Sequence, residues 1–88
     1  MISQHEISTF RVVQTSSGWL TARQIAPLAA VAERTARWHA ARLVALGVFE
    51  QDEVFGGYRY RVQPHATADA EQLIAALNTA AAVLGAAP

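Results

Sequence analysis

Residues 48–64, VFEQDEVFGGYRYRVQP, alternate between apolar and polar side chains on both sides of a Gly-Gly pair. Alternation with a period of two is typical of strands that bury one face, and a Gly-Gly pair suits the tight turns that match the twist of a hairpin. A turn at Gly56-Gly57 pairs three residues of the first strand with three of the second: Phe55 with Tyr58, Val54 with Arg59, and Asp52 with Arg61. The run therefore predicts a half-buried β-hairpin with a charged outer face.

Two capping signals predict helices before this hairpin. The segment SQHE at residues 3–6 is spaced as a capping box, and apolar residues at helical spacing follow it, which predicts a helix over residues 4–15. The segment TARQ at residues 21–24 is a second capping box, which predicts a helix that starts there. Pro27 removes an interior hydrogen bond from that second helix, so we expect it to be short or kinked.

The segment that precedes the hairpin predicts a third helix over residues 33–46, which Gly47 ends in a left-handed conformation. At about 100° per residue, Ala36, Ala40 and Leu43 share a buried face. The opposite face carries residues that the core does not need: Arg34, Trp38, Ala41 and Ala45, flanked by Arg37 and Arg42. The arginines therefore surround a helix face that we expect to be exposed.

The charge of the chain is balanced overall but unevenly distributed. Seven arginines and seven acids give a formal net charge of zero, which argues against a strongly electrostatic nucleic-acid binder. Four of the arginines lie between residues 21 and 48, where Glu33 is the single acid, and residues 72–88 carry no ionisable side chain. The chain therefore has a basic middle and a neutral carboxyl-terminal tail.

Several kinds of site have no basis in the sequence. There is no cysteine, and His5, His39 and His65 lack metal-ligand spacing, so we expect no metal and no cofactor. No nucleophile, base and orienting acid are placed together, so we expect no catalysis, and no effector-binding domain is evident. The amino terminus lacks a basic region followed by an apolar run, and the tail is too short and alanine-rich to span a membrane, so we expect a cytoplasmic protein.

The tail predicts a last helix that begins at Thr67 or Asp69. Its apolar residues recur at spacings of three and four and form a heptad-like seam: Leu73, Ile74, Leu77, Ala80, Ala81 and Leu84. Because a lone surface helix needs a polar face, we expect this seam to pair with its copy in a two-fold homodimer. Packing on its own domain, beside the first helix, is the alternative.

The order helix, short strand, helix, turn, helix, hairpin resembles the winged helix-turn-helix domain. WLTARQIAPLAAVAERTARWHAARLVALGVFE, from residue 19 onward, is similar to the helix-turn-helix of that family, and YRYRV at residues 58–62 resembles the returning wing strand of MarR-type and ArsR-type bacterial repressors. The resemblance implies an α+β, mostly helical fold, with a three-helix core and a β-hairpin wing over residues 1–64 and a dimerisation helix over residues 65–88. It also implies a small dimeric transcriptional regulator that binds double-stranded DNA sequence-specifically.

The resemblance further implies how the exposed arginines act. The helix over residues 33–46 lies in the major groove, where the forked donors of arginine suit the two acceptors of guanine. The residues implied in DNA contact are Thr21, Arg23, Arg34, Thr35, Arg37, Trp38, Arg42, Arg59 and Arg61. On this hypothesis Arg23 and Arg42 contact phosphate, and Arg59 and Arg61 reach an adjacent minor groove or the backbone from the wing.

These roles have structural alternatives. The arginines of the third helix can simply solvate an exposed face, and nearby acids can neutralise Arg59 and Arg61. Trp38 can cover a neighbouring helix or a dimer partner, since a large indole gains most from burial. We expect His39 to be a packed or hydrogen-bonded residue. For the whole protein, the alternative is a winged-helix scaffold that binds other proteins in a larger complex without direct contact to DNA.

Overall fold

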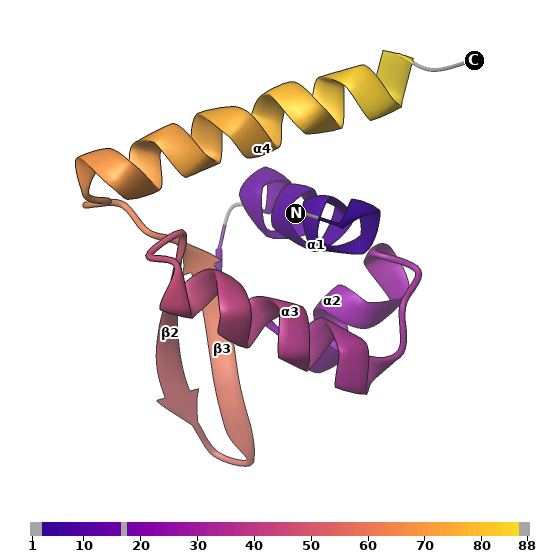
Figure 1. The fold of residues 1–88 in the computed structure, drawn as a ribbon. Helices are drawn as coiled ribbons and strands as arrows, with labels where there is room; N and C mark the ends of the chain where they lie inside the picture. Colours follow the sequence, from indigo (N-terminus) through magenta and orange to yellow (C-terminus); the bar gives the residue numbers. More distant parts are fainter. Residues whose placement is uncertain (1–2, 17, 87–88) are drawn as a thin grey trace.

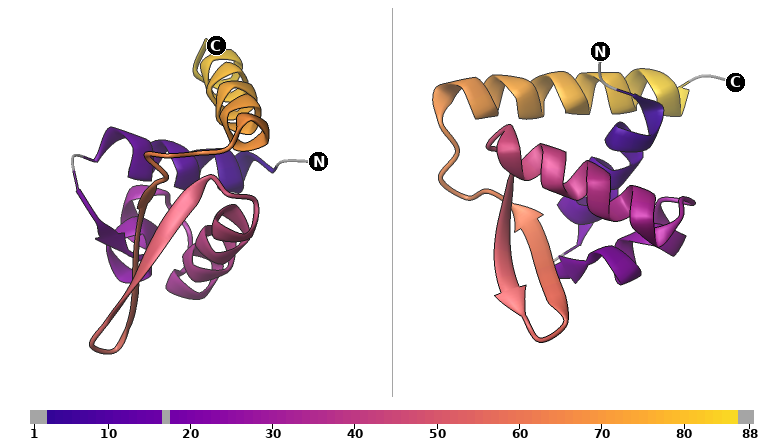
Figure 2. Two further views of the ribbon diagram at one scale, coloured as in Figure 1. Left: turned by 90° about the vertical axis from the view of Figure 1, so that its left-hand side faces the viewer. Right: turned by 60° about the horizontal axis from the view of Figure 1, so that its bottom comes forward.

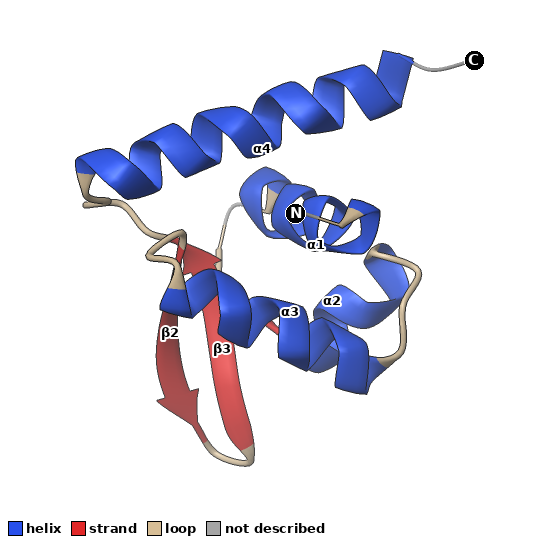
Figure 3. Ribbon diagram, in the orientation of Figure 1, coloured by secondary structure: helices blue, strands red, loops and turns tan. Residues whose placement is uncertain are grey.

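The computed structural model describes residues 3–16 and 18–86, with the side chains of residues 84–86 outside that description. The elements follow in the order α1 (Gln4–Thr15), β1 (Leu20–Thr21), α2 (Ala22–Leu28), α3 (Glu33–Ala45), β2 (Phe49–Val54), β3 (Gly57–Val62) and α4 (Ala68–Ala86). Figures 1 and 3 show α1, α2 and α3 grouped beside the hairpin, with α4 laid across α1. The expected α+β class with mostly helical content is confirmed.

Reciprocal side-chain caps begin α1 and α2. The Ser3 hydroxyl accepts a hydrogen bond from the Glu6 amide, and the Glu6 carboxylate accepts one from the Ser3 amide. Thr21 and Gln24 make the same exchange at the start of α2. Both predicted capping boxes are therefore confirmed. α2 contains Pro27 and spans seven residues, as expected of a short helix.

At the ends of α3 and at the start of α4, the capping differs from the reciprocal boxes of α1 and α2. Ala32 precedes α3 and supplies no side-chain cap. Gly47 follows α3 with a φ of +78°, the predicted left-handed conformation, and a Cβ there would lie 3.4 Å from the Cβ of Ala70. The Thr67 hydroxyl accepts a hydrogen bond from the Ala70 amide at 3.3 Å, so Thr67 caps α4.

The three strands form an antiparallel sheet in the order β1-β3-β2, with the hairpin register displaced from the prediction. The turn residues are Phe55 and Gly56, not Gly56 and Gly57, because Gly57 already pairs with Val54 as the first residue of β3. The observed cross-strand pairs include Glu53 with Tyr58, Asp52 with Arg59, and Glu50 with Arg61. Since the displacement is two residues, each side chain keeps its predicted face of the sheet.

The core lies where α1, α2, α3 and the inner face of the hairpin meet. Phe10 of α1 and Phe49 of β2 are fully buried, and their rings stack with centroids 6.4 Å apart. Ile25 of α2 is also fully buried. Ala36 and Ala40 of α3 reach zero exposure, and their small side chains allow α3 to lie close to its neighbours.

α4 packs on the same core. Leu77 has no exposed surface, and the other described residues of the predicted seam are partly buried against the core: Leu73, Ile74, Ala80 and Ala81. The side chain of Leu84 lies outside the described residues. The seam therefore packs within the chain beside α1, which was the alternative to a subunit contact, and α4 shares one hydrophobic core with residues 3–64. Figure 2 shows α4 on one side of the molecule and the hairpin tip projecting on the other.

Candidate nucleic-acid interface

The face of α3 that points away from the core carries basic and aromatic side chains. Arg34 and Trp38 are exposed, and Thr35 is half-buried. The exposed fraction is 60% for Trp38 and 61% for the side chain of Arg37. Together with Ala41, these residues border a shallow hollow of about 480 Å³. The orientation predicted from helical periodicity is therefore confirmed.

The arginines near this face differ in their ion pairs. The guanidinium of Arg37 donates to the carboxylate of Glu33 at 3.1 Å, one helical turn earlier. Both side chains are exposed, so this pair contributes little to stability and a ligand can replace it. Arg23 and Arg34 make no ion pair within the described part of the chain. Their donors are therefore available to a ligand.

Arg42 is held by a buried carboxylate. Its Nη1 lies 3.1 Å from Oε1 of Glu6, which is only 3% exposed, and its guanidinium carbon lies 5.9 Å from the centroid of the Trp38 ring. Glu6 also caps α1 through the Ser3 amide. Arg42 therefore links α1 to α3 and supports Trp38 from one side. Its side chain is still 43% exposed, so the phosphate contact that the resemblance implies stays a prediction.

His39 is a packed residue, as expected. It is 6% exposed, its ring meets the Trp38 ring edge-on at 5.1 Å between centroids, and its Nδ1 lies 3.7 Å from Oε1 of Glu6. That distance is too long for a hydrogen bond, and Nδ1 has no other partner among the described residues. Burial lowers the pKa of His39 below its ordinary value, against an opposing influence from Glu6. His39 is therefore favoured in its neutral form.

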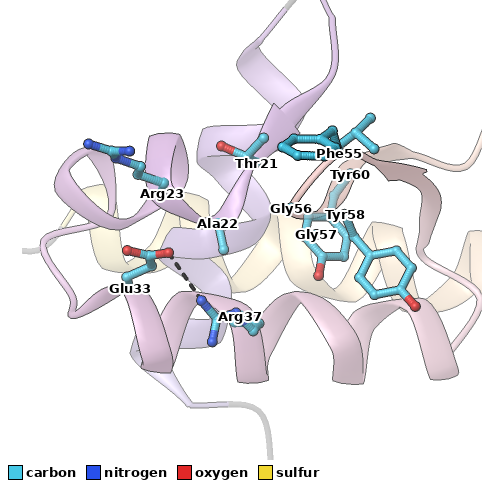
Figure 4. A pocket seen from close by; sticks show the side chains of 11 residues that line it. Thr21, Ala22, Arg23, Glu33, Arg37, Phe55, Gly56, Gly57, Tyr58 and Tyr60 are labelled. Carbon is cyan, nitrogen blue, oxygen red and sulfur yellow. Dashed lines mark hydrogen bonds and ion pairs between the residues drawn. The ribbon is translucent and has the colours of Figure 1, made fainter.

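A second hollow, of about 360 Å³, separates α2 and α3 from the hairpin tip. Figure 4 shows the side chains that surround it: Thr21 from the end of β1, Arg23 from α2, Glu33 and Arg37 from α3, and Phe55, Tyr58 and Tyr60 from the hairpin region. The Thr21 hydroxyl already accepts the cap hydrogen bond from Gln24, so it is partly committed. Phe55 is fully exposed at the hairpin tip, whereas Tyr60 is buried, which raises the pKa of its phenol.

Arg59 and Arg61 are occupied on the outer face of the sheet. Arg59 lies 2.7 Å from Asp52 and Arg61 lies 3.1 Å from Glu50. Both guanidinium groups also stack over the Trp19 ring, at 4.7 Å and 4.4 Å from its centroid. The ion pairs agree with the alternative in which nearby acids neutralise Arg59 and Arg61. They leave the two arginines less available to a ligand than Arg34.

Two supporting residues of this surface were not assigned from the sequence. Glu6 was expected only as a cap of α1, and no spacing signal connects it to Arg42, because the contact is made by packing α1 on α3. The sequence gives Trp19 no role beyond the start of the segment that resembles the helix-turn-helix. Its role follows from the pairing of Leu20 with Tyr60, which brings the indole beside Arg59 and Arg61, and a two-residue strand gives too little signal to predict that pairing.

Comparisons with protein-family models, with curated proteins and with solved structures found no match. Among the described residues, no group of three or more histidine, cysteine, aspartate or glutamate side chains is arranged to hold a metal ion. Within residues 3–16 and 18–86, no helix is long and apolar enough to cross a bilayer. Since no comparison gives an assignment, the candidate interface is described from the positions and contacts of its own residues.

Proposed function

We propose that this chain is a winged-helix domain that binds double-stranded DNA, with α3 in the major groove and the β2–β3 hairpin as the wing. The observation that carries this proposal is the exposed face of α3, where Arg34, Arg37 and Trp38 are covered neither by the hairpin nor by α4. A helix enters the major groove only if such a face is uncovered. The element order and the sheet order β1-β3-β2 are consistent with this fold assignment.

In this proposal the side chains divide into contacts and supports. Arg34 and Arg37 offer paired donors to the O6 and N7 acceptors of guanine, and DNA displaces Glu33 from Arg37. Arg23, which borders the hollow between α2, α3 and the hairpin tip, contacts phosphate. Arg42 keeps α3 fixed on α1 through Glu6. Arg59 and Arg61 stiffen the wing through their carboxylate partners rather than reading bases.

Fluorescence anisotropy tests the proposal, with duplexes selected from a random-sequence pool and titrated at two salt concentrations. We expect log affinity to fall with log salt, by about 0.9 for each phosphate neutralised. Arg34→Ala and Arg37→Ala should each weaken specific binding by about tenfold to a hundredfold and relax base preference.

Arg11→Ala is the matched control, because it removes the same charge from an exposed position on α1. It should retain the affinity of the unaltered protein to within about twofold. Equal losses of affinity in Arg34→Ala, Arg37→Ala and Arg11→Ala would show that the arginines of α3 contribute only positive charge and no base-specific contact. Absence of binding at both salt concentrations would reject the proposal.

We also propose that two copies act together through α4. The exposed side of this helix carries Ala75, Ala76, Thr79, Ala82 and Val83, with no charged residue after Glu71. A two-fold contact on this side, opposite to the seam that packs on α1, brings two α3 helices to two half-sites. Doubling the contacts offsets the small charge of one subunit.

The zero net charge and the paired arginines of the hairpin favour a second candidate, a winged-helix scaffold for other proteins. The anisotropy titration separates the two candidates. A scaffold predicts no binding to any duplex in either buffer, and unchanged behaviour of the Arg34 and Arg37 variants.

A further inference from the structure

Trp38 is contacted by two neighbouring side chains although most of its surface is exposed. The guanidinium of Arg42 lies 5.9 Å from the centroid of its ring, and the ring of His39 meets it edge-on at 5.1 Å. Yet 60% of the tryptophan remains accessible. An indole gains most from burial, so this uncovered indole is suited to an apolar contact with a ligand.

The hollow beside this indole has an apolar floor and basic edges. Ala41 lies one turn after Trp38 on the same face of α3, and its methyl side chain leaves a recess next to the larger ring. Thr35 and the guanidinium-bearing Arg34 and Arg37 complete the border. A small apolar group fits such a recess, and the arginines at its border favour a carrier molecule with negative charge.

We infer that the recess between Trp38 and Ala41 accepts the 5-methyl group of a thymine that neighbours a guanine contacted by Arg34 or Arg37. This inference rests on the proposed DNA-binding function and deepens it. Thymine presents a 5-methyl group beside its O4 acceptor in the major groove, whereas the other three bases present no methyl group there. The basic border favours DNA over an apolar protein segment as the occupant, since the arginines would lose their hydration against such a segment.

The test removes the methyl group from the DNA and leaves the protein unaltered. The tightest duplex selected from a random pool is compared with the same duplex in which deoxyuridine replaces each thymidine. Deoxyuridine keeps the hydrogen-bonding edge and lacks the 5-methyl group. Since burying one methyl group contributes about fourfold in affinity, we expect the deoxyuridine duplex to bind about fourfold more weakly for each methyl that enters the recess.

Two protein variants then test whether the preference for the thymidine duplex depends on the recess. Trp38→Ala should bind both duplexes equally, measured at low salt, where the arginine contacts keep the complex measurable. Leu28→Ala, at a residue that is 66% exposed and does not border the recess, should keep the full preference for thymine. Sedimentation of Trp38→Ala should match that of the unaltered protein. Dissociation into smaller species would show that a second copy occupies the recess and would overturn the inference.

The outcomes separate this inference from the function on which it rests. Equal affinity of the unaltered protein for both duplexes overturns the thymine contact and leaves DNA binding intact. A thymine preference that persists in Trp38→Ala overturns it as well. Absence of binding to either duplex rejects the proposed function itself.

Discussion

At the scale of single residues, arginines that look alike in the sequence differ in what holds them. Arg42 is bound to the buried carboxylate of Glu6, and Arg59 and Arg61 are bound to acids on the neighbouring strand. Arg34 makes no ion pair within the described residues. Periodicity predicts which arginines reach the surface, but availability to a ligand depends on partners from other elements.

His39 gives the stability of the protein a specific pH dependence. Burial lowers the pKa of the folded His39 below the ordinary value of 6.5, so in acid the unfolded chain binds its proton more readily than the folded chain does. The contribution of His39 is therefore fully present above 6.5 and is lost as the pH falls through the lowered pKa. His39→Phe should flatten this decline, measured as the urea midpoint above and below pH 6.5.

His65→Phe is the control, because His65 is exposed. It should keep the pH profile of the unaltered protein. Parallel profiles for the unaltered protein and His39→Phe would show that His39 does not contribute to the acid sensitivity.

At the scale of elements, the sequence predicts where helices begin and which face of a helix is buried better than it predicts what that face packs against. The capping boxes at residues 3–6 and 21–24 are local, so their spacing alone locates α1 and α2. The hairpin faces were also predictable, but its register was not, because Gly56 and Gly57 both permit a turn and the choice depends on pairing along the whole hairpin. The seam of α4 suited either a second copy or α1, and no residue within the helix decides between them.

The exposed face of α3 was predictable because its signal also lies within one segment of the sequence. Ala36, Ala40 and the arginines follow a strong helical period, so the side that holds Arg34 and Trp38 could be inferred. The contacts that support this side were not predictable. They join residues of different elements, as Glu6 joins Arg42, and depend on the packing of complete helices.

The packing of α4 on the core has a measurable consequence for stability. Leu77 is fully buried, so Leu77→Ala should lower the free energy of unfolding by about 2–5 kcal/mol through lost burial and the cavity that remains. Leu28→Ala removes an apolar side chain from α2 at a position that is 66% exposed and outside the proposed subunit contact, and should cost less than about 0.5 kcal/mol. Chemical denaturation monitored by circular dichroism measures both. If Leu77→Ala lowers the free energy of unfolding as little as the control does, α4 is not docked on α1 in solution.

At the scale of the whole molecule, the candidate surfaces point in different directions. Figures 1 and 2 show α4 and the hairpin tip on opposite sides, with α3 between them. A contact through the outer side of α4 therefore leaves α3 and the hairpin of each copy uncovered. The two proposals, DNA binding by α3 and pairing through α4, do not compete for the same residues.

Pairing through α4 predicts a dimer at micromolar concentration in sedimentation equilibrium. Val83→Glu should shift the protein to monomers, because the contact would bury an unpaired carboxylate. It should also weaken DNA binding by about a hundredfold or more, since each half-site then binds alone. Gln51→Glu adds the same charge at an exposed position of β2 and should leave the dimer intact. A monomer in the unaltered protein would reject the pairing, and a dimer that survives Val83→Glu would exclude the outer side of α4 as its contact.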